Sequence, residues 1–302
     1  MRRSFWLIMI LPVILASACR ESAKIREARK HAMLVALASK VPETYVSPPV
    51  SSRKVFHSSA DIAACVRNKD CHVLLTVDHQ TLGFKAPGNS RAAVRAAVAV
   101  QVPVIEIDIR FSRDRKLYLT HGDELHDTTN LRGKLMEMDP KQLAHAILSN
   151  GETLPTFGEI YAISRGKSVL YLDCKENVIG TIADWFARYG SFDDGIFYAG
   201  YGEEEIQTAA AMKRKYPQML VSVRFDSLED FRSAFGGLPD VVEIGLPDKK
   251  NIDFLHRLGV KVYATSTPFD TLPTKLKAKV PTMFYLSNSD FVETNTPLVW
   301  MQ

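Results

Sequence analysis

The stretch VIEIDIR at residues 104–110 alternates apolar and charged side chains along its whole length. This period of two predicts a β-strand with Glu106, Asp108 and Arg110 on one face. In a parallel barrel that face is the interior, where unpaired charge is costly. A cation bound by Glu106 and Asp108 would account for the charges, because hard oxygen ligands suit Mg²⁺ or Ca²⁺. The alternative is a half-exposed edge strand whose charged side chains face water.

Similar strand-like runs recur along the chain, with helical stretches between most of them. Strands are expected at residues 74–78, 104–110, 116–120, 168–173, 195–198, 220–223, 241–244 and 260–264, with a ninth candidate at 282–286. Helices are expected at residues 91–100, 140–148, 177–189, 203–216 and 251–258. This alternation predicts a (β/α)8 TIM barrel, in which one strand candidate is surplus, and we expect 282–286 to be a closing segment. An open doubly wound sheet is disfavoured because no glycine fingerprint follows a first strand.

Two of the eight histidines end predicted strands. His79 follows the run at 74–78 and His121 follows the run at 116–120, which is where barrel enzymes carry their chemistry. Asp173 and Lys175 end the run at 168–173 in the same way. A pair of histidines beside a metal can serve as general acid and general base near neutral pH. The other six histidines are interpreted as packed or surface residues.

Several short motifs, taken in order and spacing, resemble those of the glycerophosphodiester phosphodiesterase family. DHQT at 78–81 with APGNS at 86–90 is similar to the family's His-Arg-Gly and Pro-Glu-Asn-Thr. EID at 106–108 matches Glu-x-Asp, HG at 121–122 resembles His-Asp, LPTF at 154–157 resembles Ile-Pro-Thr-Leu, and DCK at 173–175 resembles Glu-x-Lys. The likeness covers residues 72–290 and is strongest up to Lys175.

The resemblance implies a metal-dependent hydrolase that converts a glycerophosphodiester and water to an alcohol and glycerol phosphate. It implies that His79 and His121 are the acid–base pair. It also implies Glu106, Asp108 and Asp173 as ligands of one divalent metal, Mg²⁺ or Ca²⁺. Lys175 would contact the phosphate of a small phosphodiester or phospholipid-derived substrate.

Four positions depart from the family pattern. The arginine after the first histidine is Gln80, the glutamate of Pro-Glu-Asn is Gly88, and the aspartate after the second histidine is Gly122, with Asp123 one step away. The third metal ligand is shortened to Asp173, as in the sphingomyelinase D branch of the superfamily.

Losing a positioned charge at a phosphate costs on the order of 10² to 10³ in rate. Arg110 is the preferred replacement for the lost cation, and Arg224 is a second candidate. Three functions stay open: a divergent diesterase, a non-catalytic envelope binding module, and phospholipase D-like action on intact phospholipids.

The N-terminal residues 1–19 read as a signal peptide. A basic start at 1–3 precedes an apolar stretch at 5–15, too short to span a membrane, and a small-residue cleavage site at 16–18. Cleavage before Cys19 would suit lipid attachment, so an exported lipoprotein of the periplasm or outer envelope is expected, with simple secretion as the alternative. Residues 20–54 are interpreted as a basic helix and a proline-containing linker, and residues 55–302 as the barrel domain.

The remaining cysteines and the net charge refine this picture. Cys65 and Cys71 could close a small disulfide loop in an oxidising compartment. Cys174 should point away from the barrel interior and is interpreted as a core cysteine. The formal charge of +4 is modest, so no nucleic-acid partner is predicted.

Overall fold

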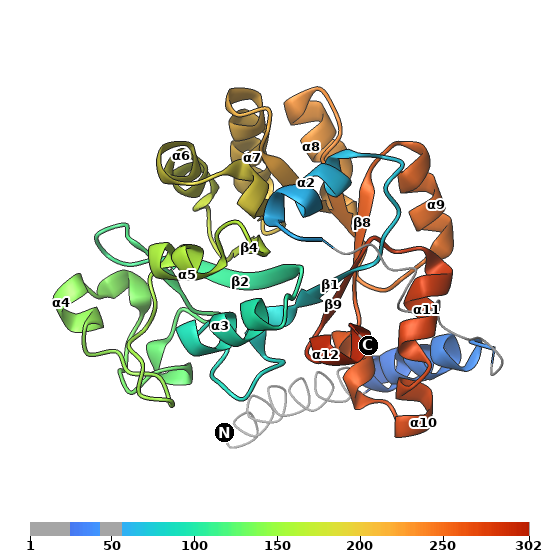
Figure 1. Ribbon diagram of the computed structural model, residues 1–302, viewed down its shortest axis with the longest axis horizontal. Coiled ribbons are helices and arrows are strands. Elements are labelled where there is room, and N and C mark those ends of the chain that lie inside the picture. Colours follow the sequence, from blue (N-terminus) through green and yellow to red (C-terminus); the bar gives the residue numbers. More distant parts are fainter. Residues whose placement is uncertain (1–24, 43–55, 302) are drawn as a thin grey trace, which may run out of the picture. The chain divides into compact units, whose positions relative to one another are not determined.

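Eight parallel strands form a closed barrel in the computed structural model, which describes residues 25–42 and 56–301 (Figure 1). In spatial order the strands are β1 (Leu75–Asp78), β9 (Phe291–Thr294), β8 (Lys261–Thr265), β7 (Val241–Glu243), β6 (Leu220–Arg224), β5 (Gly195–Ala199), β4 (Val169–Cys174) and β2 (Val104–Phe111). Pairing of β1 with β2 closes the ring. The predicted (β/α)8 fold is confirmed.

Two strand predictions were wrong. The surplus strand is β3 (Leu117–Leu119), which pairs antiparallel with β2 and stands outside the barrel ring. Residues 282–286 lie in the helix α11 (Val280–Ser287), and the barrel closes instead through β9. A short apolar run such as TMFYL does not distinguish a buried helix from a buried strand by its periodicity.

The helices follow the strands around the barrel, so that α5 to α9 succeed one another in Figure 1. Their bounds are α2 (Ser59–Arg67), α3 (Arg91–Ala99), α4 (Pro140–Leu143), α5 (Phe157–Ser164), α6 (Ile179–Tyr189), α7 (Glu203–Lys215), α8 (Leu228–Phe235), α9 (Lys249–Arg257), α10 (Thr274–Lys277) and α12 (Pro297–Trp300). The helix predicted at 140–148 is shorter than expected and ends at Leu143.

The alternation in β2 divides its side chains between two cores. Ile105, Ile107 and Ile109 belong to the large cluster that includes side chains of α3, α5 and α6. Val104 belongs to a second cluster that includes Tyr171 and the buried side chains of α2. Glu106 and Asp108 share the face of Val104, so the barrel interior holds the predicted carboxylates.

The connection from β2 to β4 contains a long additional segment, residues 112–156, before its helix α5. This segment contains β3, α4 and two short 3₁₀ helices at Leu125–Asp127 and Leu135–Glu137. It has its own apolar cluster, which includes Tyr118, Leu125 and Leu148. The segment therefore packs as a small insertion beside the carboxyl end of β2.

The described residues fall into two compact units. Residues 56–267 and 284–301 form the barrel unit. Residues 25–42 and 268–283 form the second, in which residues 25–39 are helical and bury Leu34 and Ala38. In that unit the Lys279 ammonium donates a 3.3 Å hydrogen bond to the Val41 carbonyl.

Several sequence predictions lie outside the described residues. These are the signal peptide at 1–19 with its lipid-attachment candidate Cys19, and most of the linker up to residue 54. None of the helices in the described ranges is long and apolar enough to cross a membrane. Within the barrel unit, Cys65 and Cys71 form a disulfide, and Cys174 is buried in the outer core.

Candidate active site

Three carboxylates meet at the carboxyl ends of β2 and β4. The strand register pairs Asp108 with Asp173, and Glu106 lies two residues earlier on the same face of β2. One oxygen from each carboxylate lies within 4.8 Å of the other two. Asp108 is fully buried and Glu106 is 3% exposed. The predicted metal ligands are therefore brought together.

These carboxylates carry more negative charge than their neighbours neutralise. Glu106 Oε1 and Asp173 Oδ1 are buried and have no hydrogen-bond partner among the described residues. Burial raises the pKa of Glu106, and the nearby charges of Asp108 and Asp173 raise this pKa further. Burial also raises the pKa of Asp173, against the opposing effect of Lys175. Three carboxylates, two of which have unpaired buried oxygens, are the donor set that a hard divalent cation requires, so these residues fit a metal ion.

Lys175 supplies a positive charge next to this group. Its ammonium lies 2.9 Å from Asp108 Oδ1 and 2.5 Å from Asp173 Oδ2. Burial acts to lower the pKa of Lys175, but the charges of Asp173 and Asp108 outweigh it and raise this pKa above its ordinary value. The ammonium is therefore charged at neutral pH. The Tyr201 hydroxyl, which lies 3.1 Å from Lys175 Nζ, donates a 3.0 Å hydrogen bond to Asp173 Oδ2.

His79 begins the loop after β1 and is held by residues that follow β9. Its Nδ1 lies 2.8 Å from Asn295 Oδ1. Because an amide oxygen only accepts, this contact assigns the proton to Nδ1 and leaves Nε2 unprotonated in the neutral ring. Nε2 lies 3.3 Å from Glu293 Oε1 and 3.3 Å from Gln80 Nε2. Burial raises the pKa of Glu293, and the charge of His79 opposes that rise.

The loop at residues 80–89 links the first histidine to the carboxylates. The backbone N–H of Gln80 donates a 2.7 Å hydrogen bond to Glu106 Oε2. The Asn89 amide group donates to Asp108 Oδ2 at 2.7 Å and accepts from the Asp108 backbone N–H at 3.1 Å. A hydrogen bond from Asn89 N to Gln80 O closes the loop. This one loop therefore fixes two of the three carboxylates.

Two departures from the family motif lie next to each other. A Cβ atom placed on Gly88 would lie 3.5 Å from the Gln80 Cβ and 3.1 Å from the Gln80 carbonyl oxygen. The resemblance implies an arginine at position 80 and a glutamate at position 88, which are residue types that pair. Because Gln80 and Gly88 replace both of these residues, this chain has neither charge at the two positions. No buried arginine or glutamate is left there without its opposite charge.

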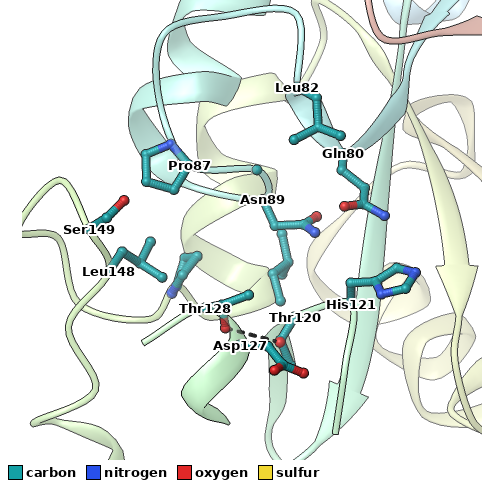
Figure 2. A pocket seen from close by; sticks show the side chains of 13 residues that line it. Gln80, Leu82, Pro87, Asn89, Thr120, His121, Asp127, Thr128, Leu148 and Ser149 are labelled. Carbon is teal, nitrogen blue, oxygen red and sulfur yellow. Dashed lines mark hydrogen bonds between the residues drawn. The ribbon is translucent and has the colours of Figure 1, made fainter. Parts of the chain in front are cut away.

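The second histidine lies at the edge of a pocket of about 310 Å³ (Figure 2). His121 is exposed, and its carbonyl oxygen accepts hydrogen bonds from Arg110 Nε at 3.1 Å and Nη2 at 3.0 Å. Arg110, predicted to bind phosphate, thus holds the backbone of this loop. Arg224, the second candidate cation, is 3.4 Å from Asp226.

Gly122 stands where the His-Asp motif has its aspartate, and the side chain of Asp127 lies close to that position. A Cβ atom on Gly122 would lie 3.1 Å from Asp127 Oδ2. Asp123, the adjacent candidate in the sequence, instead pairs with Lys134 at 3.2 Å. The carboxylate that lies beside position 122 is therefore that of Asp127, and not that of Asp123.

Several functional side chains were missed by the sequence analysis. Three of them belong to none of the short motifs: Asn295, Glu293 and Tyr201. Each contacts a site residue that is distant from it in the sequence. Asn89 stood in a motif without an assigned role. Its position in the loop after the first histidine was the signal that could have identified it.

The fold and the site define a class: TIM barrels with a group of acidic side chains that could hold a cation at the carboxyl-terminal face of the barrel. A family model described as the Glycerophosphoryl diester phosphodiesterase family matches residues 79–196. This range contains both histidines, the three carboxylates and Lys175. The predicted resemblance is therefore confirmed over residues 79–196, which match the model of this family.

Individual proteins show the same likeness in sequence or in fold. YhdW of Bacillus subtilis (strain 168), which carries a glycerophosphodiester phosphodiesterase name, is 22% identical over 173 residues. The match covers 55% of this chain and 64% of YhdW. A glycerophosphoryl diester phosphodiesterase from Parabacteroides distasonis ATCC 8503 superposes with a TM-score of 0.66 at 20% identity, over 82% of this chain and 90% of that one.

A phosphodiesterase from Oleispira antarctica was solved with its product sn-glycerol-3-phosphate. It superposes with a TM-score of 0.60 at 18% identity, over 75% of this chain and 94% of that one.

Proposed function

We propose that this protein is a metal-dependent phosphodiesterase that hydrolyses glycerophosphodiesters to an alcohol and glycerol phosphate. The observation that carries the proposal is the group of three carboxylates, two of which have buried oxygens without a hydrogen-bond partner among the described residues, placed beside Lys175 and connected to His79 through one loop. The family match over residues 79–196 and the product held by the Oleispira antarctica structure support the substrate class.

Glu106, Asp108 and Asp173 would hold one divalent cation, Mg²⁺ or Ca²⁺. When bound, the cation supplies Lewis-acid polarisation of the phosphoryl oxygens. Lys175 adds an ammonium charge that offsets negative charge on the phosphate as the transition state forms.

The two histidines would move the protons. Asn295 orients His79 so that Nε2 faces the site and can take a proton from the attacking water. The new bond joins the water oxygen to phosphorus, and the bond between phosphorus and the alcohol oxygen breaks. His121 delivers a proton to the departing oxygen, so the products are a neutral alcohol and a phosphate monoester.

The proposed location is the cell envelope, with Cys19 as a lipid anchor to the membrane. The signal-like composition of residues 1–19 supports export. The Cys65–Cys71 disulfide also supports it, because disulfides persist in oxidising compartments.

Release of choline or ethanolamine from glycerophosphodiesters by the mature chain, residues 20–302, tests the activity. We expect release with Mg²⁺ or Ca²⁺, none with chelator, and none from His79→Ala. Retained metal binding without release would favour action on intact phospholipids. Absence of both would favour the non-catalytic binding module, which the neutral residues Gln80 and Gly88 suggest.

A further inference from the structure

The pocket beside His121 lies between two segments that are distant in sequence. One wall is the loop at residues 80–89, and the other comes from β3, the loop that follows it and residues 148–155 (Figure 2). Asn89 belongs to the pocket wall and also donates to Asp108 Oδ2. The pocket is therefore one side chain away from the carboxylate group, at a place where part of a bound diester would extend.

The walls combine aliphatic surface with uncharged hydrogen-bonding groups. Leu82, Pro87 and Leu148 supply apolar surface, and Figure 2 shows the side chains of Thr128 and Ser149 among them. Thr128 Oγ1 lies 3.5 Å from Thr120 Oγ1, which is buried and donates a 3.2 Å hydrogen bond to the Gly122 carbonyl, so Thr128 supplies the more accessible hydroxyl group. Aliphatic and hydroxyl surface in alternation suits a ligand with C–H faces and several hydroxyl groups.

The lining also excludes two other ligand types. None of its 13 residues, all of which lie in the described part of the chain, is a lysine or arginine, so the pocket is a poor site for phosphate. None is a phenylalanine, tyrosine or tryptophan, whereas quaternary ammonium groups are recognised by the faces of those rings. The acidic member, Asp127, has a side chain that is 58% exposed and lies 3.3 Å from His126 Nε2.

Gln80 and Gly88, the two uncharged residues that depart from the family motif, leave space in this pocket. Gln80 and Gly88 both line it. A Cβ atom on Gly88 would lie only 3.0 Å from Leu82 Cδ2 and 3.1 Å from the Gln80 carbonyl, so a larger side chain would crowd this wall. An arginine and a glutamate at these positions would bring charge and bulk to the same wall.

We propose that this pocket binds the alcohol half of the diester and selects an uncharged polyol, such as glycerol or a cyclic polyol, over a cationic amino alcohol. This inference rests on the proposed phosphodiesterase function. The phosphate lies at Lys175 and the carboxylates, and the polyol extends past Asn89 toward Thr128. Water adds its oxygen to phosphorus, the bond from phosphorus to the polyol oxygen breaks, and that oxygen leaves with a proton from His121.

The test compares diesters that differ only in the alcohol. We expect kcat/KM for glycerophosphoglycerol and glycerophosphoinositol to exceed that for glycerophosphocholine and glycerophosphoethanolamine at least tenfold. Thr128→Val should raise KM for the polyol diesters three- to tenfold and raise KM for glycerophosphocholine less, because a quaternary ammonium donates no hydrogen bond to the lost hydroxyl. Thr181→Val, an exposed threonine on α6, is the matched control. Equal kcat/KM values, or a preference for the cationic alcohols, would overturn the inference.

A binding measurement separates this inference from the proposed function. Calorimetric titration of the His79→Ala variant with glycerophosphoinositol and glycerophosphocholine requires no turnover. We expect at least tenfold tighter binding of the polyol diester, and loss of that difference in His79→Ala/Gly88→Leu, in which the added side chain fills the pocket. Equal affinities would overturn the inference even if the wild type hydrolyses every diester. A missing activity with the binding difference intact would count against the hydrolysis alone.

Discussion

Two groups of side chains in the barrel unit could each offer three ligand atoms to a metal. They differ in whether their carboxylate oxygens have hydrogen-bond or ion-pair partners. Glu106, Asp108 and Asp173 form the first group, and His72, His256 and Asp290 form the second. The first lies at the carboxyl ends of β2 and β4. The second surrounds Asp290, whose carbonyl accepts from the first residue of β1 at the opposite end of the barrel strands.

In the second group the protein satisfies its own carboxylate. Asp290 Oδ2 accepts a 2.8 Å hydrogen bond from the Val262 N–H and lies 2.7 Å from His256 Nε2. Asp290 Oδ1 lies 3.5 Å from the buried ammonium of Lys261. In the first group, Glu106 Oε1 and Asp173 Oδ1 lack a hydrogen-bond partner in the described ranges. Proximity of side chains that can bind a metal is therefore weak evidence for a metal site, and unpaired buried oxygens are the stronger evidence.

The largest expected effect comes from changing an unsatisfied carboxylate. Glu106→Gln should lower kcat/KM for diester hydrolysis by about 10²- to 10³-fold, because it removes a ligand and a transition-state charge. The free energy of unfolding without metal should not fall, since the substitution removes a buried carboxyl that repels Asp108 and Asp173. Steady-state kinetics with excess metal and urea unfolding with chelator measure the two effects. An unchanged rate would show that the first group is not the active site.

Replacing the carboxylate of the second group by an amide should lower stability and leave the catalytic rate unchanged. Asp290→Asn should lower the free energy of unfolding by about 3 kcal/mol, because it leaves Lys261 and His256 without their buried counter-charge. The kcat should stay at the wild-type value. Asp253→Asn, which breaks the exposed Lys249–Asp253 pair, is the control and should cost less than about 1 kcal/mol. Similar losses in both variants would remove the distinction between the two groups.

Asp78 is another buried carboxyl with an unsatisfied oxygen, and it should give a pH-dependent effect. Burial raises the pKa of Asp78 to about 7 from its ordinary 3.8, and the Oδ2 atom has no hydrogen-bond partner among the residues described. Because the folded pKa is the higher one, the protein loses stability as the pH rises from about 4 to 7, where only the unfolded chain releases the proton.

Asp78→Asn should therefore match the wild type near pH 4 and exceed it by about 1–2 kcal/mol at pH 8. Urea unfolding at both pH values measures this difference. A stability gain of the same size at pH 4 would mean that ionisation of Asp78 is not its cause.

The smallest expected effect concerns the orientation of His79. Asn295→Ala should lower kcat about tenfold with little change in KM, because the imidazole loses the contact that fixes its tautomer. The pH profile of kcat should shift as well, and Asn295→Asp, which keeps an acceptor oxygen, should restore most of the rate. A stability loss with an unshifted pH profile would assign Asn295 a purely structural role.

The local pattern of apolar and polar residues predicted most of the fold and the first pair of candidate metal ligands, Glu106 and Asp108. The period of two in residues 104–110 predicted which side chains face the barrel interior, and the alternation of strands and helices predicted the barrel. Pattern failed for β3 and β9, since short apolar runs do not show which strand they will pair with. It also failed for Asn295, whose contact with His79 spans 216 positions of sequence.

The sequence by itself determined the barrel and the face that carries Glu106, Asp108 and Asp173, because side-chain direction along a strand is a local property. It also placed His79 and Lys175 directly after strands. Only the tertiary structure decided which oxygens stay unpaired, that Arg110 holds the backbone at His121, and that Gln80 and Gly88 adjoin one pocket. Those outcomes depend on barrel closure, which brings together loops whose contacts no local period encodes.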